Sequence, residues 1–557
     1  MFLSFENLSS ASSSSSTSLF GPRLGSLVCK NGVKITTPNL ITPTSRGVVP
    51  HLSRDNVLRT QSISWIHVPY ESFLECKPPI PTLGLSLHDL LGFRHDRHVI
   101  SMSLRDLSDG REMPSNAAKY VSAWCIRGAR KVTPEEYRRY TSLAKPDIVY
   151  ALADVQPVAS QKRLIKSVER TAEWLVQLLK PCDAEDNAQA SAPSIILQMP
   201  GGQSNQARSA FAHTLIEPLH PTDVHTLKPL RLSCLDDAIS GYAVDGSIEQ
   251  IKASLDGLNE KKLRIAHSTT FSTLTIPPAT GLSPSTGVDM IRGPHDMLDL
   301  IRDVGIDLFG AEWVIKLAQW GIALDFEFPP PQAPINSKID SGSGTSPKIR
   351  GSKRDIGHNL YDVRYRMDCT RLLNSNSSVT CPCFTCAPSS CSSEDVIRHS
   401  RVDDPPLYDL KSPPRSRTPH TRAYIHHLLH THEMSSYALL VGHNLAIIST
   451  FLQGVRNSLE LSGGQFNAEV DKFFEYYASG EHESIYPSEV AKVEAVVEAV
   501  VAEATEGEVL LPQGSGVRDT LTGKGTGILL FDEARVCHAE VERLRGKGSL
   551  KRDREVG

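Results

Sequence analysis

Short apolar runs alternate with longer amphipathic segments from residue 19 to about residue 328. The runs 147–152, 194–198 and 241–244 have the length and apolar character of buried strands. Between the first two, apolar residues recur at helical spacing over 161–179, which predicts an amphipathic helix. Strands that alternate with helices imply an α/β fold with a parallel sheet, and the pattern favours neither an open nor a closed sheet.

Several stretches interrupt this pattern with residues that cannot fill a core. Residues 329–346 are rich in Pro, Gly and Ser, and residues 387–420 carry prolines among charges. Such composition buries too little apolar surface to offset the entropy of ordering, so we expect two flexible insertions. The Ser-rich residues 1–18 are expected to be disordered. A weak helix is predicted over 490–501, ahead of a Gly-rich tail that indicates no function.

The composition is 40% hydrophobic and 22% charged, which is typical of a globular protein with a packed core. The net charge of −4 argues against a surface that neutralises many phosphates, so any contact with nucleic acid must be local or shared with a partner. Residues 1–20 resemble neither a signal peptide nor a transit peptide, and we find no run of about 18 apolar residues that could cross a membrane. We therefore expect a soluble, cytosolic protein.

Cysteine is concentrated in one part of the chain. Five of the eleven cysteines fall between residues 369 and 391, and three of them form the string Cys381-Pro-Cys383-Phe-Thr-Cys386. Thiolates two residues apart in an extended segment face the same side, and a short turn brings in the third. The alternative is three reduced core cysteines. The spacing favours a tetrahedral zinc site that lacks one ligand.

The spacing leaves the fourth ligand open. Six downstream side chains could complete the site: Cys391, His426, His427, His430, His432 and His443. A lone histidine in an apolar run is more often a core residue than a ligand, and the paired histidines at helical spacing could equally form a polar helix face or a second metal site. Chemistry alone therefore identifies three ligands out of four.

A resemblance narrows this choice. The string Thr421-Arg-Ala-Tyr-Ile-His-His-Leu428, followed by Gly442-His-Asn-Leu445, is similar to the zinc-subdomain signature of the tRNA-guanine transglycosylase family. In that family the ligand is the histidine of the His-Asn pair. The resemblance therefore implies one structural zinc ion held by Cys381, Cys383, Cys386 and His443.

Weaker similarities cover most of the chain, including Gly21-Pro-Arg-Leu-Gly25 and Val304-Gly-Ile-Asp-Leu-Phe309. Together they imply the family's (β/α)₈ TIM barrel with a zinc-binding subdomain inserted near its C-terminal end. The division we expect is a disordered N-terminus (1–18), the main part of the barrel (19–328), a flexible insertion (329–355), the zinc-binding subdomain and barrel end (356–480, with the insertion 387–420) and a C-terminal extension (481–557).

The chain differs from the family in the strings that carry the catalytic residues. Catalytic members carry a nucleophilic aspartate after Val-Asp-x-Phe, whereas this chain reads Ile306-Asp-Leu-Phe-Gly310, and glycine has no nucleophile. The family's Asp-Ser-Gly-Gly-Phe-Gln string, which holds the general acid/base, is also absent, and Ala123-Trp-Cys-Ile-Arg-Gly128 stands in its place. We expect no catalytic residues and no enzymatic activity of the chain itself.

The resemblance then implies a non-catalytic subunit that forms a heterodimer with a catalytic subunit of the family. Such a subunit would help to hold tRNA during the exchange of wobble guanine for queuine in tRNAs with GUN anticodons (Asp, Asn, His and Tyr). Contact with the mitochondrial outer surface stays open. Two alternatives remain: an active transglycosylase that uses Asp307 or Asp154, or a zinc-stabilised RNA-binding module. Asp154 follows a predicted strand and could lie at the barrel rim or in a surface turn.

Overall fold

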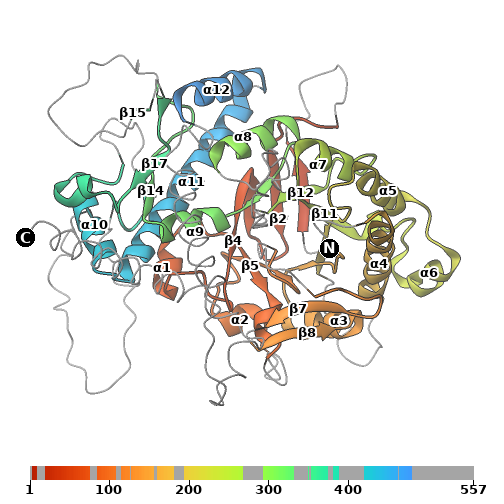
Figure 1. Cartoon of the computed structure of the whole chain (residues 1–557). Helices are drawn as coiled ribbons and strands as arrows, with labels where there is room; N and C mark the ends of the chain where they lie inside the picture. Colours follow the sequence, from red (N-terminus) through yellow and green to blue (C-terminus); the bar gives the residue numbers. More distant parts are fainter. Residues whose placement is uncertain are drawn as a thin grey trace, which may run out of the picture.

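Eight parallel strands close into a barrel at the centre of the molecule (Figure 1). The computed structural model describes residues 3–8, 19–75, 85–107, 114–125, 127–155, 160–180, 193–267, 293–331, 349–350, 353–373, 381–387, 419–461 and 463–478. In order round the barrel the strands are β4 (Asn39–Pro43), β5 (Trp65–Pro69), β6 (Val99–Ser103), β9 (Ile148–Tyr150), β10 (Ser194–Gln198), β11 (Ile239–Val244), β12 (Leu263–Ala266) and β13 (Leu308–Gly310), which pairs with β4. The closed form of the α/β fold is confirmed.

The strands are apolar because both of their faces are covered. Every residue of β5 and β6 is buried, since one face points into the barrel and the other packs against helices. The predicted strand 194–198 is β10, while β9 and β11 overlap the other two predicted runs. The sequence pattern thus located three of the eight barrel strands.

Helices surround the barrel (Figure 1). They are α1 (Arg54–Arg59), α2 (Leu87–Leu91), α3 (Pro134–Ala144), α4 (Gln161–Leu179), α5 (Asn205–Ile216), α6 (Pro221–Thr226), α7 (Ile248–Ser254), α8 (Pro294–Asp303) and α9 (Glu312–Gln319). The predicted helix over 161–179 is α4. Helix α3 begins at a capping box, in which the Thr133 hydroxyl accepts from the Glu136 N–H and the Glu136 carboxylate accepts from the Thr133 N–H.

A small antiparallel sheet precedes the barrel and shares its interior core. It comprises β1 (Leu3–Asn7), β2 (Gly25–Cys29) and β3 (Lys34–Thr37), and β1 lies within the segment that was expected to be disordered. Leu27 and Ile35 of this sheet belong to the same apolar cluster as Trp65 of the barrel. The sheet therefore closes the amino-terminal end of the barrel, opposite the end where barrel enzymes place their chemistry.

The chain beyond β13 builds a second unit against the barrel. It contains β14 (Ile322–Leu324), β15 (Ile349–Arg350), β16 (Lys353–Arg354), β17 (Gly357–Asn359), the 3₁₀ helix η5 (Val363–Met367), α10 (Arg422–His430), α11 (Ser435–Leu461) and α12 (Gly463–Tyr476). Strands β14 and β17 pair antiparallel, and α11 packs on β14 and α9. The expected insertions 329–355 and 387–420 and the extension after 480 lie largely outside the described residues.

Helix α11 differs from the expectation that no segment could cross a membrane. Within the described part of the chain it is the one helix that is long and apolar enough, but 67% of its most apolar window is buried inside the protein. Its contacts with α9, β14 and α12 are those of a core helix. Its apolar character therefore follows from its place in the packing.

Candidate metal centre and barrel mouth

The three cysteines of the Cys-x-Cys-x-x-Cys string lie in one tight loop. Cys381, Cys383 and Cys386 are all buried, and the Cys386 N–H donates to the Cys383 sulfur (3.3 Å). The loop is tied to helix α11 because the Thr385 hydroxyl donates to the Leu439 carbonyl oxygen (2.8 Å). This attachment holds the thiols beside the next turn of α11, where His443 lies.

His443 completes the cluster from α11. Its Nδ1 lies 3.6 Å from the sulfur of Cys381, 3.9 Å from that of Cys383 and 3.3 Å from that of Cys386. The four potential ligand atoms all lie within 4.8 Å of one another, so the group could hold a metal ion. Three thiols and one imidazole are the soft and borderline donors that zinc takes in closed, four-coordinate sites. The residues present therefore fit the expected zinc.

The ring of His443 is oriented by strand β14. Its Nε2 lies 2.8 Å from the carbonyl oxygen of Leu324, which can only accept, so this nitrogen carries the proton. The neighbouring Asn444 binds the same strand with both ends of its amide: it accepts from the Leu324 N–H (2.9 Å) and donates to the Ile322 carbonyl (3.0 Å). With the Nε2 proton in this bond, the neutral ring presents its Nδ1 lone pair to the sulfurs, as a metal ligand requires.

Gly442 allows this loop to approach α11 closely. A β-carbon at position 442 would collide with the ring of Phe384, which lies between Cys383 and Cys386 in the loop. Glycine is therefore needed beside His443 for a packing reason, and not for its backbone freedom. In the string Gly442-His-Asn, the glycine allows the close contact with the loop and the histidine is a candidate ligand. The asparagine binds β14 through both ends of its amide, a link called the clamp below.

The buried thiols influence one another strongly. The pKa of Cys383 lies well below its ordinary value. Burial raises this pKa, but the interactions with Cys381, Cys386 and His443 lower it by more than burial raises it. The pKa of Cys386 is raised, chiefly by Cys381 and Cys383 and then by burial. Opposite shifts within one cluster mean that a single thiolate suppresses ionisation of its neighbour. A divalent cation would remove this conflict, because it stabilises every thiolate at once.

The other histidines considered as the fourth ligand point elsewhere. His426 is buried, and its Nδ1 lies 2.8 Å from the Leu360 carbonyl oxygen, while His430 Nε2 lies 3.2 Å from that of Tyr361. His427 and His432 are exposed to solvent. The cluster 426–432 therefore braces α10 against the segment after β17, and the described residues include no second metal group there. Cys391 lies outside the described residues.

Asp307 lies at the wrong end of the barrel for chemistry. It precedes β13, it is fully buried, and Arg23 binds both of its carboxylate oxygens, one at 2.9 Å. The Arg264 N–H also donates to it (2.7 Å). Asp307 thus anchors the amino-terminal sheet to the barrel, whereas active sites of such barrels form at the carboxyl ends of the strands.

Asp154 does lie beyond the carboxyl end of a strand, β9, yet it is not a surface residue. Arg163 binds both of its oxygens (2.6 and 2.8 Å), Arg170 binds one (3.1 Å), and the Asn116 amide donates to the other (2.7 Å). Burial raises its pKa, but Arg163 and Asn116 outweigh this, so the pKa lies below its ordinary value. The carboxylate is thus fixed as an anion inside the protein.

The carboxyl ends of the strands enclose a polar cluster that the sequence did not reveal. His67 of β5 contacts the hydroxyls of Ser101 and Ser103 on β6, both at 2.9 Å. Tyr150 of β9 and His267, which follows β12, approach to 2.8 Å. The only sequence signal is position, because each residue lies in a barrel strand or directly after one.

Glu312 completes this cluster beside β13. Its carboxylate lies 3.8 Å from Nδ1 of His267, and both side chains are buried. A β-carbon on Gly310 would collide with the same carboxylate. The space beside the end of β13 is therefore filled by a side chain two residues further along.

Comparison with known proteins assigns the chain to a family. The family model described as "Queuine tRNA-ribosyltransferase" matches residues 19–479, which include the whole barrel and the thiol–imidazole cluster. The chain belongs to the queuine tRNA-ribosyltransferase family. The resemblance that the zinc signature indicated is thereby confirmed.

Curated relatives in this family carry one name. "Queuine tRNA-ribosyltransferase accessory subunit 2" of Schizosaccharomyces pombe is 25% identical over 83% of this chain and 83% of its own length. The proteins of that name from Trichoplax adhaerens (25% identical, 79% of this chain and 92% of the relative) and Xenopus tropicalis (22%, 80% and 95%) are similar to it over nearly their full length. The similarity therefore extends over the barrel and the second unit together.

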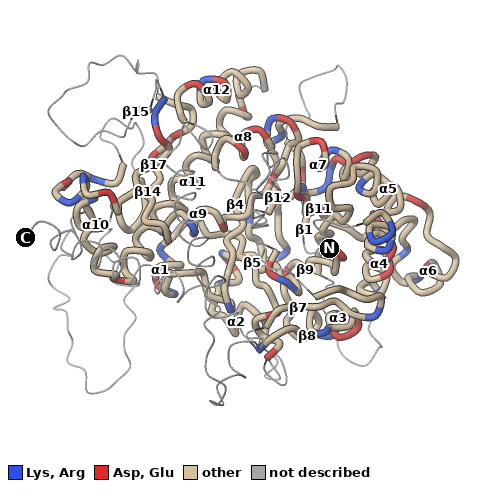
Figure 2. Tube along the Cα trace, viewed as in Figure 1, with Lys and Arg blue, Asp and Glu red and all other residues tan. Residues whose placement is uncertain are grey.

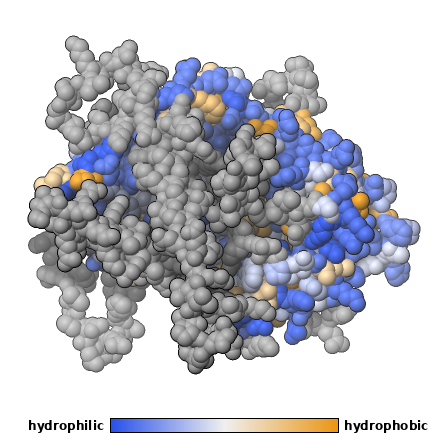
Figure 3. Space-filling view, viewed as in Figure 1, coloured by the Kyte–Doolittle hydropathy of each residue, from blue (hydrophilic) through white to orange (hydrophobic). Residues whose placement is uncertain are grey.

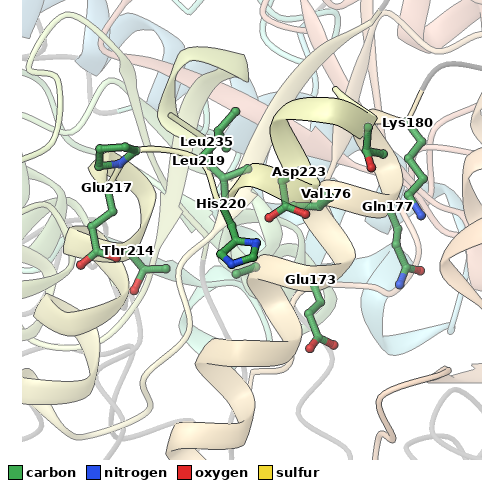
Figure 4. A pocket seen from close by; sticks show the side chains of 13 residues that line it. Glu173, Val176, Gln177, Lys180, Thr214, Glu217, Leu219, His220, Asp223 and Leu235 are labelled. Atoms are coloured by element: carbon green, nitrogen blue, oxygen red, sulfur yellow. The ribbon is translucent and has the colours of Figure 1, made fainter. Parts of the chain in front are cut away.

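A queuine tRNA-ribosyltransferase barrel is expected to act at its strand ends, and the pocket in Figure 4 lies elsewhere. It has a volume of about 380 Å³ and is formed by α4, α5, α6 and the segments next to them. Glu173, Lys180, Glu217, His220 and Asp223 are among its lining residues. The pocket is on the outer helical layer. It shares no residue with the metal centre or with the polar cluster at the carboxyl ends of the strands, called the mouth cluster below (His67, Ser101, Ser103, Tyr150, His267 and Glu312).

Proposed function

We propose that this chain is the non-catalytic accessory subunit of a queuine tRNA-ribosyltransferase. It forms a heterodimer with a catalytic subunit and helps to hold tRNA, while the partner exchanges wobble guanine for queuine in tRNAs with GUN anticodons. The names of the relatives and their full-length similarity support this role. We propose a cytoplasmic location for the complex.

One observation carries the proposal: β13 ends at Gly310, where the family's nucleophilic aspartate would stand. Base exchange through a covalent intermediate needs a carboxylate that attacks the ribose carbon. Glycine offers none, and the nearby carboxylate of Glu312 lies against Gly310 and is buried. A buried carboxylate beside a histidine and a tyrosine is poorly placed to reach a nucleotide in a duplex or loop.

The mouth cluster supports the loss of base binding as well. His67, Tyr150 and His267 are buried and hydrogen-bond with one another or with serine hydroxyls. A pocket that receives a planar base keeps polar groups free to bind it. Here most of these polar atoms already bond within the protein, and among the described residues Nδ1 of His267 is one that has no hydrogen-bond partner, so little of the cluster is left for a base to bind.

We further propose that the four-residue cluster holds one structural zinc ion through Cys381, Cys383, Cys386 and His443. Four protein ligands leave no open coordination position, so the ion would stabilise the fold and take no part in hydrolysis. The ion would cross-link the cysteine loop, α11 and, through the His443–Leu324 hydrogen bond, strand β14. The residue boundaries expected for a separate zinc-binding subdomain, 356–480, remain part of this proposal.

The zinc-bearing unit offers a surface for the partner subunit. Val363 and Met367 of η5 are 71% and 82% exposed, and Tyr424 of the adjacent α10 is 44% exposed. Figure 3 shows hydrophobic side chains at the end of the molecule where η5 lies in Figure 1. Exposed apolar residues gathered on one surface favour a protein contact. We propose that this surface joins the heterodimer interface.

The two alternative functions are less well supported. An active enzyme that uses Asp307 or Asp154 would need a free carboxylate at the mouth, but Arg23 holds the first at the opposite end and three side chains hold the second. An independent RNA-binding module would need a broadly basic surface. Figure 2 shows Lys and Arg interspersed with Asp and Glu, in keeping with the net charge of −4.

Co-expression with a catalytic subunit of the family tests the proposal. The chain should copurify with that subunit in equal amounts, and incorporation of labelled guanine into a GUN-anticodon tRNA should require the partner. A tRNA with adenine at the wobble position is the matched control. Exchange by the isolated chain, or failure to bind any catalytic subunit, contradicts the proposed role.

A further inference from the structure

The hairpin between β6 and α3 carries exposed charge of one sign only. It comprises β7 (Val121–Cys125) and β8 (Gly128–Val132), paired antiparallel. From Pro114 to Pro134 the sequence has four cations, Lys119, Arg127, Arg130 and Lys131, and no acidic residue. A chain with a net charge of −4 thus concentrates positive charge in one short segment.

The hairpin is fixed firmly to the barrel. The buried carboxylate of Glu71 accepts from the N–H groups of Asp106 and Trp124, both at 3.2 Å, and the Cys125 thiol donates to the Glu71 carbonyl oxygen (3.3 Å). Glu75 accepts from the Arg127 N–H (2.6 Å). The acidic groups nearest to the hairpin therefore bind its backbone and leave its cationic side chains for another partner.

All four cations face solvent. Arg130 and Lys131 point to opposite faces of β8 yet are both exposed, because β8 is an edge strand, whereas β7 beside it is almost entirely buried. Within the described residues none of the four side chains forms an ion pair; Lys131 lies over the ring of Tyr120, 4.5 Å from its centroid. The nearest exposed acids in sequence are Glu135 and Glu136, and Glu136 caps its own helix.

The location of the hairpin is as important as its charge. It follows the carboxyl end of β6 and precedes α3, so it lies on the rim of the barrel that faces substrates in enzymes of this architecture. Exposed cations that form no ion pair with another described residue suit, on such a rim, a polyanion whose charges are spaced along a backbone. A planar arginine and a compact lysine both bind phosphate oxygens without reading base sequence.

We propose that the β7–β8 hairpin binds the phosphate backbone of the tRNA held by the complex. The inference rests on the proposed accessory function, which it deepens by assigning an RNA-binding surface to the non-catalytic barrel. Basic residues on an edge strand also prevent strand-to-strand association. That role alone would leave RNA affinity unchanged, so the two explanations give opposite results in a binding assay.

The test compares two triple variants in the complex with the catalytic subunit. One is Arg127→Gln/Arg130→Gln/Lys131→Gln in the hairpin; the other, Lys228→Gln/Arg231→Gln/Lys261→Gln, removes three exposed cations at distant positions. Binding of an unmodified tRNA with a GUG anticodon is measured over a series of salt concentrations. Thermal unfolding and native mass measurement check that both variants fold and assemble.

The hairpin variant should bind tRNA about tenfold or more weakly, and its slope of log affinity against log salt should be shallower by about 2 to 3. The distant variant should retain the slope of the unaltered complex to within about one unit. Equal affinity and slope in the two variants overturn the hairpin assignment while leaving the accessory role intact. Loss of heterodimer assembly in the hairpin variant also overturns it, because the hairpin would then bind protein and not RNA.

Discussion

The carboxylate of Glu312 occupies the space that a side chain on Gly310 would need. Both residues are buried at the end of β13, and the Glu312 carboxylate lies 3.8 Å from Nδ1 of His267. The carboxylate at position 312 thus fills the space beside position 310, where glycine has no side chain. A larger side chain at position 310 therefore requires the Glu312 carboxylate to move.

Gly310→Asp should destabilise the protein by about 1 to 3 kcal/mol, because the new side chain collides with Glu312 and brings a second carboxylate beside it. Gly464→Asp is a suitable control, since nothing lies within 4 Å of a β-carbon there. Chemical unfolding measures both. The variant Gly310→Asp/Glu312→Ala should recover part of the loss; an unchanged stability of Gly310→Asp would show that the carboxylate of Glu312 does not fill this space.

Cys383→Ser should abolish stoichiometric zinc and lower the melting temperature, because a structural site that loses a thiolate loses most of its affinity and the folding energy linked to it. Cys369→Ser is the matched control: Cys369 is exposed and lies outside the four-residue cluster. Elemental analysis and thermal unfolding of the two variants provide the measurement. Equal zinc content in both would refute the ligand assignment.

Asn444→Ala should cost about 1 to 3 kcal/mol for each buried backbone group left without a partner. The side chain of Asn444 binds the Leu324 N–H and the Ile322 carbonyl of β14, and both bonds are buried. Asn457→Ala, on the exposed face of the same helix, controls for the loss of an amide. If the two variants unfolded at the same denaturant concentration, the clamp between α11 and β14 would carry no stability.

Stability should fall as the pH drops from about 7 to about 5, in part because of His67. Burial, followed by the nearby His267, holds the pKa of His67 well below its ordinary value, so the folded protein keeps this ring neutral. The unfolded chain takes up the proton near pH 6.5, and stability is then lost as the pH falls, by up to about 1.4 kcal/mol per pH unit for this group.

His67→Gln should flatten this pH dependence, because glutamine can still bond to Ser101 and Ser103 but does not titrate. His225→Gln, at an exposed position of α6, should leave the dependence unaltered. Unfolding in denaturant at pH 5, 6 and 7 compares the two. An identical pH profile for His67→Gln and the unaltered protein would contradict the contribution of the buried ring.

The sequence predicted the α/β class, three strands and helix α4. A strand that is buried on both faces is a short apolar run, and a helix that is buried on one face repeats its apolar residues at helical spacing. It could not decide that the sheet closes, since closure depends on β13 pairing with β4, across more than 260 residues of sequence. Only the family resemblance indicated a barrel. Strand β1 of the antiparallel sheet was missed, because its Ser-rich surroundings suggested disorder.

Local spacing predicted only part of the candidate metal centre. Three cysteines stood out through local spacing, whereas His443 was one of several histidines, and the resemblance selected it. What distinguishes His443 physically is that its Nδ1 lies 3.3, 3.6 and 3.9 Å from the three sulfurs, which belong to a loop about 60 residues earlier in the sequence. The mouth cluster left no local signal, because His67 lies in β5, Tyr150 in β9 and His267 directly after β12, and they meet only when the barrel closes.

Covalent labelling of the complex on tRNA tests the central claim most directly. The complex is incubated with radiolabelled GUN-anticodon tRNA, quenched in denaturant and separated by denaturing electrophoresis. The account predicts that the label migrates with the catalytic subunit alone. A labelled band at the mass of this chain would contradict it, because one of its own carboxylates would then have attacked the ribose.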